Sequence, residues 1–332
     1  MTDTFKALRA TESDGEVTMA FAELTASDLP DGDVAVDVAY STLNYKDGMA
    51  LNGNAGRIMR SFPMVPGIDL SGTVTRSQSP DYQVGDRVLV NGWGLGETAW
   101  GGYAQKARVR SEWLVHVPGA FDLAQAMAIG TAGFTSMLCV MALEHMDVQP
   151  GAGPVLVTGA AGGVGSLAVA LLAKLGYEVA ASTGRADTHD FLRGLGAATI
   201  VDRADLEADS GRPMDKPQWA GAVDTVGGAI LGHVLRAVQP FGTVAACGNA
   251  AGFAFETTVL PFILRGVSLI GVNSVFCPAP RRQEAWARLA ADLPLDKLAD
   301  VTTVAPFGDL LDLSKDILKG RVRGRVVIDV NS

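Results

Sequence analysis

The sequence is poor in the residues that build disulfide frameworks and metal centres. Its 332 residues include three cysteines, Cys139, Cys247 and Cys277, and four histidines. The cysteines are scattered without a Cys-x-x-Cys pair, and no two histidines stand at ligand spacing, which argues against a disulfide scaffold and against a zinc site. Scattered thiols are typical of a reducing compartment, so we expect a cytoplasmic protein without a metal.

An excess of positive charge is also missing, as is an apolar run typical of a membrane span. Charged residues make up 19% of the chain, and the formal net charge is −9. This balance argues against general binding to nucleic acid or to anionic membranes. The N-terminus lacks the apolar core of a signal peptide, and the most apolar helix-like run, residues 126–143, is interrupted by glycine as in soluble proteins. We therefore expect neither nucleic-acid nor membrane partners.

Apolar residues and glycine are plentiful. Hydrophobic residues make up 48% of the chain, which also contains 39 glycines. This composition is typical of globular α/β enzymes, and the length fits about two domains.

A strand–turn–helix–strand pattern occupies residues 154–185. The β-branched run Val155–Val157 is typical of a buried parallel strand, and a glycine-rich turn follows it. Apolar residues then recur at helical spacing as far as Leu175, and Gly176 stands where a left-handed cap would end the helix. Residues 178–182 supply the second strand. The pattern predicts a βαβ unit.

The glycine turn predicts a binding site for a dinucleotide. Unpaired N–H groups at a helix N-terminus favour a diphosphate, and glycine lets the phosphate approach the backbone. The chain departs from Gly-x-Gly-x-x-Gly by an alanine at the first position, and the bland alternative is an ordinary turn in an α/β sheet. The residues expected to contact the cofactor here are Ala161, Gly162, Gly163, Val164 and Gly165.

The end of the second strand distinguishes between the nicotinamide cofactors. NAD-binding proteins usually place Asp or Glu about 20 residues after the glycines, where it holds the ribose 2′-OH. This chain has Ser182, Thr183, Gly184 and Arg185 there, and their hydroxyls and guanidinium suit a 2′-phosphate. We predict NADPH as the cofactor, with Arg203 as a further cation near its phosphate.

The two ends of the chain predict a different architecture. Short β-rich runs separated by turn signals fill residues 1–125, with little strong helix before residue 123. A helix over residues 124–143 leads into alternating strands and helices, which continue to residue 275. A helix over Leu310–Leu318 and a strand over residues 325–330 close the chain.

Six segments carry a family resemblance. They are residues 43–47 (LNYKD), 62–69 (FPMVPGID), 92–97 (GWGLGE), 130–135 (GTAGFT), 222–227 (AVDTVG) and 261–265 (PFILR). With the glycine turn, they resemble the medium-chain dehydrogenase/reductase superfamily, in its zinc-free quinone-oxidoreductase-like branch and closest to the NADPH-dependent acryloyl-CoA reductases. The resemblance implies an α/β fold with a doubly wound parallel Rossmann sheet in residues 126–275. This NADPH-binding domain would be inserted into a GroES-like β-rich catalytic domain of residues 1–125 and 276–332.

Metal-free hydride transfer suits an activated alkene better than an alcohol. Zinc-dependent members carry Gly-His-Glu near Gly67 and a cysteine near Asn44, and this chain has neither. Hydride attack on the β-carbon of an enoyl group gives an enolate, which must be stabilised and protonated. The resemblance implies Tyr45 as a catalytic residue that contacts the nicotinamide or the carbonyl, with Asn44 orienting a carbonyl. Packing at the cleft wall is the alternative for Tyr45, and solvent is an alternative proton donor.

Further residues are candidates for contact with cofactor or substrate. The resemblance implies that Thr131 contacts the cofactor, with helix capping as the plain alternative. Gly248 and Asn273 follow later strands and are expected along the nicotinamide half. Arg325 closes a basic cluster with Arg321, expected to bind phosphate unless it is a solvated edge. The candidates for CoA phosphates are Arg57, Arg60, Arg281, Arg282 and Arg323.

These features predict NADPH-dependent reduction of acryloyl-CoA, an acyl-CoA substrate, to propionyl-CoA. A quinone or general enone oxidoreductase using NADPH and a non-catalytic NADPH-binding protein are the alternatives. The apolar segment 257–275 ends the predicted sheet, and an exposed final strand can pair with its copy. We therefore expect a homodimer.

Overall fold

The chain divides into two compact units in a computed structural model that describes residues 4–208 and 210–332. The first unit runs to Thr131 and returns at Val275–Trp286 and Thr302–Ser332. The second comprises Ala132–Ser274 and Ala287–Val301. Residues 126–131 therefore group with the first unit, and Ala287–Val301 with the second, where the sequence suggested the reverse.

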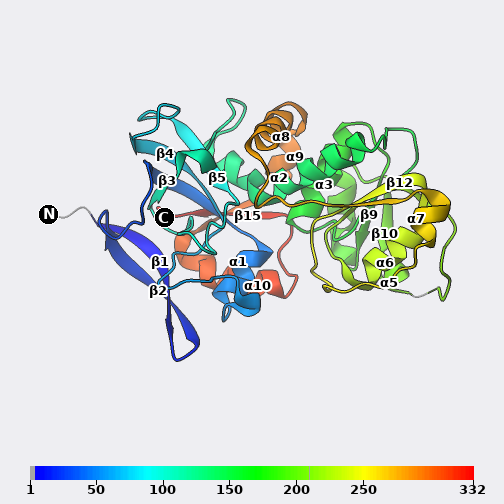
Figure 1. The fold of residues 1–332 in the computed structure, drawn as a ribbon, viewed down its shortest axis with the longest axis horizontal. Helices are drawn as coiled ribbons and strands as arrows, with labels where there is room; N and C mark the ends of the chain where they lie inside the picture. Colours follow the sequence, from blue (N-terminus) through cyan, green and yellow to red (C-terminus); the bar gives the residue numbers. More distant parts are fainter. Residues whose placement is uncertain (1–3, 209) are drawn as a thin grey trace. The chain divides into compact units, whose positions relative to one another are not determined.

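The first unit is built on a mostly antiparallel β-sheet with the strand order β14-β15-β3-β4-β5-β7, and β6 pairs with β3 beside this path. The hairpin of β1 and β2 forms a separate two-stranded sheet (Figure 1). Buried apolar side chains such as Val36, Leu70 and Phe307 fill the core. The predicted β-rich module is confirmed. Its strands are β1 (Thr4–Ser13), β2 (Glu16–Thr25), β3 (Val34–Leu43), β4 (Asp69–Ser77), β5 (Arg87–Asn91), β6 (Lys106–Val109), β7 (Val115–His116), β14 (Thr302–Pro306) and β15 (Arg325–Asp329).

A short helix, α1 (Tyr45–Leu51), follows β3 directly, and the sequence analysis did not identify it. Its first turn is closed by a capping box, in which the backbone N–H of Asn44 donates to Oδ2 of Asp47 at 2.9 Å. Gly48 lets α1 approach α10 (Leu310–Leu318), because a Cβ there would lie 2.7 Å from a methyl of Ile317. The other helical turns of this unit are η1 (Ala55–Arg57), η2 (Ser111–Trp113) and η4 (Phe307–Asp309).

The second unit contains a six-stranded parallel sheet in the order β10-β9-β8-β11-β12-β13. Strand order reverses beside β8, as it does in doubly wound dinucleotide folds, so the predicted Rossmann sheet is confirmed. The strands are β8 (Val155–Val157), β9 (Val179–Thr183), β10 (Thr199–Asp202), β11 (Trp219–Asp224), β12 (Val238–Ala246) and β13 (Ser268–Gly271). The helices are α3 (Gly163–Lys174), η3 (Ala186–Thr188), α4 (His189–Gly194), α5 (Arg203–Glu207), α6 (Gly228–Ala237), α7 (Leu260–Arg265) and α9 (Leu295–Val301).

Two longer helices, α2 (Leu123–His145) and α8 (Ala279–Asp292), cross the division between the units. By length and composition α2 could span a membrane, but 94% of its most apolar window is buried inside the protein. It is therefore a core helix. Its course bends at Gly130, whose φ of 48° and ψ of −154° are not helical.

Candidate active site and cofactor site

A buried carboxylate, Asp69, gathers polar side chains from several elements of the first unit. Its Oδ1 accepts the hydroxyl of Thr131 at 2.5 Å, and both of its oxygens accept the Thr131 backbone N–H at 3.1 Å. Its Oδ2 accepts the Thr42 hydroxyl at 2.6 Å and the Asn44 amide at 2.9 Å. Asp69 therefore caps the segment of α2 that begins after the bend at Gly130.

The guanidinium of Arg325 supplies the positive charge of this buried cluster. Its Nε donates to the carbonyl of Ala128 at 2.9 Å, and its Nη1 donates to Oδ1 of Asn44 at 3.2 Å. A Cβ at Gly130 would lie 2.8 Å from Oδ2 of Asp69 and 3.0 Å from Nη2 of Arg325. Only glycine fits this bend, because the cluster packs directly against its backbone.

A second carboxylate, Asp47, lies in the same cluster and is completely buried. Its Oδ1 accepts the backbone N–H of Ile68 at 3.0 Å, while its Oδ2 accepts from Asn44. Burial and the charge of Asp69 raise the pKa of Asp47 to about 7, against the hydrogen bonds from Asn44 and Ile68, which lower it. The neighbouring Lys46 takes no part in the cluster, because it pairs with Glu97 at 2.9 Å.

The backbone of Tyr45 adjoins this cluster, but its side chain is partly exposed to solvent. Tyr45 is the first residue of α1, directly after the Asn44 cap, and 43% of its surface is exposed. Within residues 4–208 and 210–332, its hydroxyl makes no hydrogen bond. The buried network therefore fixes the backbone at the start of α1, and the Tyr45 side chain that it positions is accessible to a ligand.

The glycine turn of the second unit has the geometry of a dinucleotide site. Helix α3 begins after Gly162, and Gly165 packs so closely that a Cβ would lie 2.3 Å from the carbonyl oxygen of Gly159. Gly176 follows the end of the helix with a φ of 87°, so the predicted left-handed glycine cap is confirmed. The close packing brings the N-terminus of α3 to the carboxyl end of β8, where doubly wound sheets bind ligands.

Arg203, the first residue of α5 after β10, lies beside Gly184, which follows β9. A Cβ at Gly184 would lie 3.0 Å from Nε of Arg203, so this guanidinium lies over the glycine, with Glu207 3.2 Å away as its ion-pair partner. The hydroxyl of Thr183 serves the turn itself, since it accepts the backbone N–H of Arg185 at 3.1 Å.

A pair of side chains that the sequence analysis missed organises the centre of this sheet. The hydroxyl of Thr158, after β8, donates to the buried carboxylate of Asp224 at 2.7 Å, and Asp224 accepts the backbone N–H of Gly227 at 2.9 Å. Gly248 packs against the same region, because a Cβ there would lie 2.1 Å from the carbonyl oxygen of Thr225. The segment AVDTVG, which ends β11, was the available signal.

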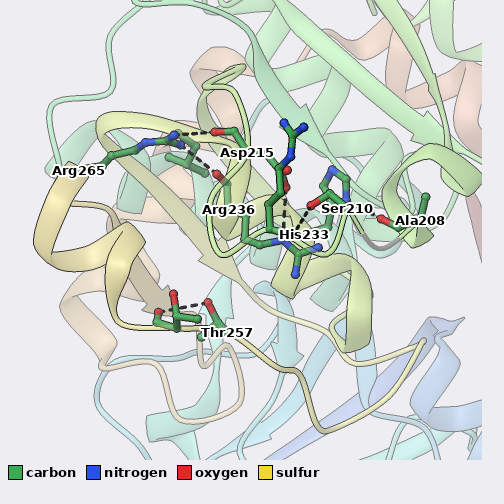
Figure 2. A network of polar contacts seen from close by, with 10 residues as sticks. Ala208, Ser210, Asp215, His233, Arg236, Thr257 and Arg265 are labelled. Carbon is green, nitrogen blue, oxygen red and sulfur yellow. Dashed lines mark hydrogen bonds and ion pairs between the residues drawn. The ribbon is translucent and has the colours of Figure 1, made fainter.

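Figure 2 shows a second polar network of this unit, around α6 and α7. Arg265 donates to the carbonyl of Arg236 at 2.9 Å and to that of Asp215 at 2.6 Å. Arg236 in turn pairs with the Asp215 carboxylate at 3.3 Å, and His233 contacts the carbonyl of Ala208. These contacts join the loop before β11 to both helices, which gives the Arg of the PFILR segment a structural role.

Known proteins match the chain over nearly its whole length. Residues 30–119 match the alcohol dehydrogenase GroES-like domain, and residues 163–291 match the family described as zinc-binding dehydrogenase. Acrylyl-CoA reductase AcuI of Ruegeria pomeroyi is 53% identical, over 97% of this chain and 97% of that protein. The chain belongs to the medium-chain dehydrogenase/reductase superfamily.

Two further members of the superfamily are similar. The yhdH oxidoreductase of Salmonella enterica, solved in complex with NADP, is 51% identical with a TM-score of 0.95, over 98% of this chain and 99% of that chain. The quinone oxidoreductase YhfP of Bacillus subtilis is 42% identical over 99% of each chain.

A zinc ion does not fit the position that zinc-dependent members of the superfamily use. That position holds Asn44 and Asp69, whose oxygens already accept hydrogen bonds from Thr42, Thr131 and Arg325. A divalent cation beside the buried guanidinium would meet like charge in a medium of low dielectric. In the described part of the chain, no group of three or more His, Cys, Asp or Glu side chains has the placement to hold a metal.

Three expected ligand contacts of this medium-chain dehydrogenase/reductase need correction. The amide of Asn44 donates to Thr42 at 2.7 Å and to both aspartates, so no amide hydrogen is left for a substrate carbonyl, and Asn44 positions α1 instead. Arg325 and Arg282 are each only 2% exposed. Arg282 donates to the carbonyl of Asn91 at 2.7 Å and lies over the ring of Trp93, which buries it away from a CoA phosphate. The candidates Arg57, Arg60, Arg281 and Arg323 are exposed.

The titration of Asp47 is expected to make stability fall as pH rises. Between about pH 4 and pH 7 the folded chain keeps the proton of Asp47 and the unfolded chain releases it, so this group contributes a slope of up to about −1.4 kcal/mol per pH unit. This stabilisation is fully present below about pH 4 and fully lost above about pH 7, and the slope is zero outside that interval. Urea unfolding at several pH values measures it.

The variant Asp47→Asn is expected to be less stable below about pH 4, where Asp47 is uncharged, because its amide would face the N–H of Asn44. Its stability should nevertheless decline less steeply with pH than that of the parent. Asp37→Asn is the matched control, since Asp37 pairs with Lys106 at the surface. Parallel pH profiles for the parent and Asp47→Asn would contradict the assignment.

Proposed function

We propose that this protein reduces the α,β double bond of acryloyl-CoA to propionyl-CoA with NADPH and without a metal. The observation that carries the proposal is the exposed phenol of Tyr45, whose hydroxyl has no hydrogen-bond partner in the described part of the chain. It occurs in a chain that is 53% identical to a protein named acrylyl-CoA reductase AcuI.

The chemistry divides between the cofactor and Tyr45. When bound, NADPH would supply a hydride to the β-carbon of the enoyl thioester. Negative charge then develops on the thioester oxygen, and the Tyr45 hydroxyl donates a hydrogen bond to it or a proton to the α-carbon. The network of Asn44, Asp47 and Asp69 keeps the start of α1 in place during this step.

The cofactor contacts of the proposal lie in three groups. The backbone from Ala161 to Gly165 takes the diphosphate, since glycine lets it approach the N-terminus of α3. Ser182, Arg185 and Arg203 take the 2′-phosphate, which a guanidinium binds through charge-assisted hydrogen bonds. The nicotinamide half contacts the third group, which consists of Thr131, Gly248, Asn273 and Tyr45.

An NADPH oxidation assay tests the proposal. We expect acryloyl-CoA to be reduced with a far higher kcat/KM than any 1,4-quinone, and NADPH to be preferred to NADH. A reductase of quinones or general enones is the second candidate, supported by the 42% identity to quinone oxidoreductase YhfP. Equal or better turnover of a 1,4-quinone in the same assay would favour that candidate and reject the first.

A cytoplasmic homodimer is part of the proposal. Strand β13 is the edge of the second unit's sheet, and apolar side chains close to it in the chain are exposed, including Phe253, Val259, Ile263 and Leu264. Pairing of β13 with its copy would satisfy the open strand edge and cover apolar surface. Elution at the monomer mass in gel filtration would reject the dimer.

A further inference from the structure

A pocket in the first unit combines two arginines with the aromatic side chain of Phe62. It has a volume of about 450 Å³, within the range of pockets that bind small molecules. The loop after α1 forms most of it, and Glu12 from β1 contributes to the rim. The loop residues that matter here are Asn54, Arg57, Met59, Arg60 and Phe62.

The loop that carries the arginines has a defined shape. The side chain of Asn54 spans it, accepting the backbone N–H of Met59 at 2.8 Å and donating to the Met59 carbonyl at 2.9 Å. The backbone of Arg57 has a φ of 53°, in the left-handed region that residues other than glycine and asparagine seldom adopt. Such a conformation persists where the surrounding contacts impose it, and it is frequent at binding sites.

Both guanidinium groups are available to an anion. Arg57 and Arg60 are exposed, and among residues 4–208 and 210–332 no carboxylate lies within ion-pair distance of either. Several other exposed arginines are paired, such as Arg193 with Asp190 at 3.1 Å, whereas Arg76 and Arg281 are exposed without an ion pair among the described residues. The pocket is lined by two unpaired arginines and one glutamate, so its local charge is positive although the protein has a net charge of −9.

Glu97 contacts both the loop that forms the pocket and the residue that follows Tyr45. The backbone N–H of Arg60 donates to the carbonyl of Glu97 at 2.9 Å. The carboxylate of the same Glu97 pairs with Lys46, which directly follows Tyr45, at 2.9 Å. A substrate whose reacting end meets Tyr45 can therefore extend towards this loop within the first unit.

We propose that this pocket binds the phosphorylated adenosine end of CoA. Guanidinium groups bind phosphate through paired, charge-assisted hydrogen bonds, and the half-buried ring of Phe62 offers apolar surface to the adenine. The inference rests on the proposed acyl-CoA substrate and deepens it, because it assigns the specificity for CoA over shorter thioesters to Arg57 and Arg60.

Kinetics with full-length and truncated substrates tests this assignment. In Arg57→Gln/Arg60→Gln, the KM for acryloyl-CoA at saturating NADPH should rise about 10–100-fold, as the loss of charged hydrogen bonds implies, with little change in kcat. Acryloyl-pantetheine lacks the nucleotide, so its kcat/KM should stay unchanged. Arg110→Gln is the matched control, since Arg110 is an exposed arginine of the same unit, outside the pocket and paired with Glu112.

Binding separates a failure of this site from a failure of the proposed function. Adenosine 3′,5′-bisphosphate is titrated calorimetrically into enzyme saturated with NADPH, so that the cofactor site cannot take the probe. Weaker binding in the double variant than in Arg110→Gln supports the pocket, even if acryloyl-CoA turns out not to be a substrate. Equal binding in the two variants, or an equal rise of KM for acryloyl-pantetheine, overturns it.

Discussion

Replacing Arg325 with methionine is expected to lower the free energy of unfolding by about 3–5 kcal/mol, the cost of leaving a buried charge without its partner. Two carboxylates, Asp47 and Asp69, lie in the cluster that this guanidinium joins. Methionine fills similar space but donates no hydrogen bond to Ala128 or Asn44. The remaining negative charge must then be buried alone or neutralised by a proton. Urea unfolding at neutral pH measures the loss.

A matched control separates burial from simple loss of charge. Arg321 belongs to the same basic run of sequence, but it is exposed and pairs with Asp316 at 3.4 Å. Arg321→Met should cost less than about 1 kcal/mol, because exposed ion pairs contribute little. A loss of that small size for Arg325→Met as well would show that the cluster tolerates the unpaired carboxylates.

Most of the fold followed from local pattern. The helix over Leu310–Leu318 was predicted to the residue, and strand β8 likewise, because the apolar spacing of each matches one regular structure. Helix α1 was missed because it is short, contains Gly48 and has no long apolar stripe. Its stability comes from the capping box of Asn44 and Asp47 and from packing on α10. The Asn-x-x-Asp spacing was the one signal available.

The site was predicted less completely, because burial depends on partners far away in the sequence. Arg321, Arg323 and Arg325 form one basic run, but the structure buries Arg325 against Asn44, which lies 281 residues away. Local pattern cannot show such a contact. The glycines were easier, since the close approach at Gly165 is a property of the βαβ turn itself. The roles of Tyr45, Arg185 and Arg203 stay predictions until a ligand tests them.

Replacing Tyr45 with phenylalanine is expected to reduce kcat for acryloyl-CoA about 100-fold, the usual contribution of a general acid or an oxyanion donor. The change removes only the hydroxyl, which makes no protein hydrogen bond in the described residues, so stability should change little. NADPH affinity should stay within about threefold, because an interaction confined to the transition state affects kcat and not ground-state binding.

Tyr82→Phe provides the opposite control for Tyr45→Phe. Its hydroxyl donates to the carbonyl of Leu114 at 2.8 Å, so its loss should reduce stability by about 1 kcal/mol and leave kcat unchanged. A fall in kcat of less than about threefold for Tyr45→Phe would assign the proton to solvent and leave Tyr45 as a packing residue. A fall near 100-fold would instead show that α1, and the buried carboxylates that hold it, replace the zinc site of related enzymes with an anchored phenol.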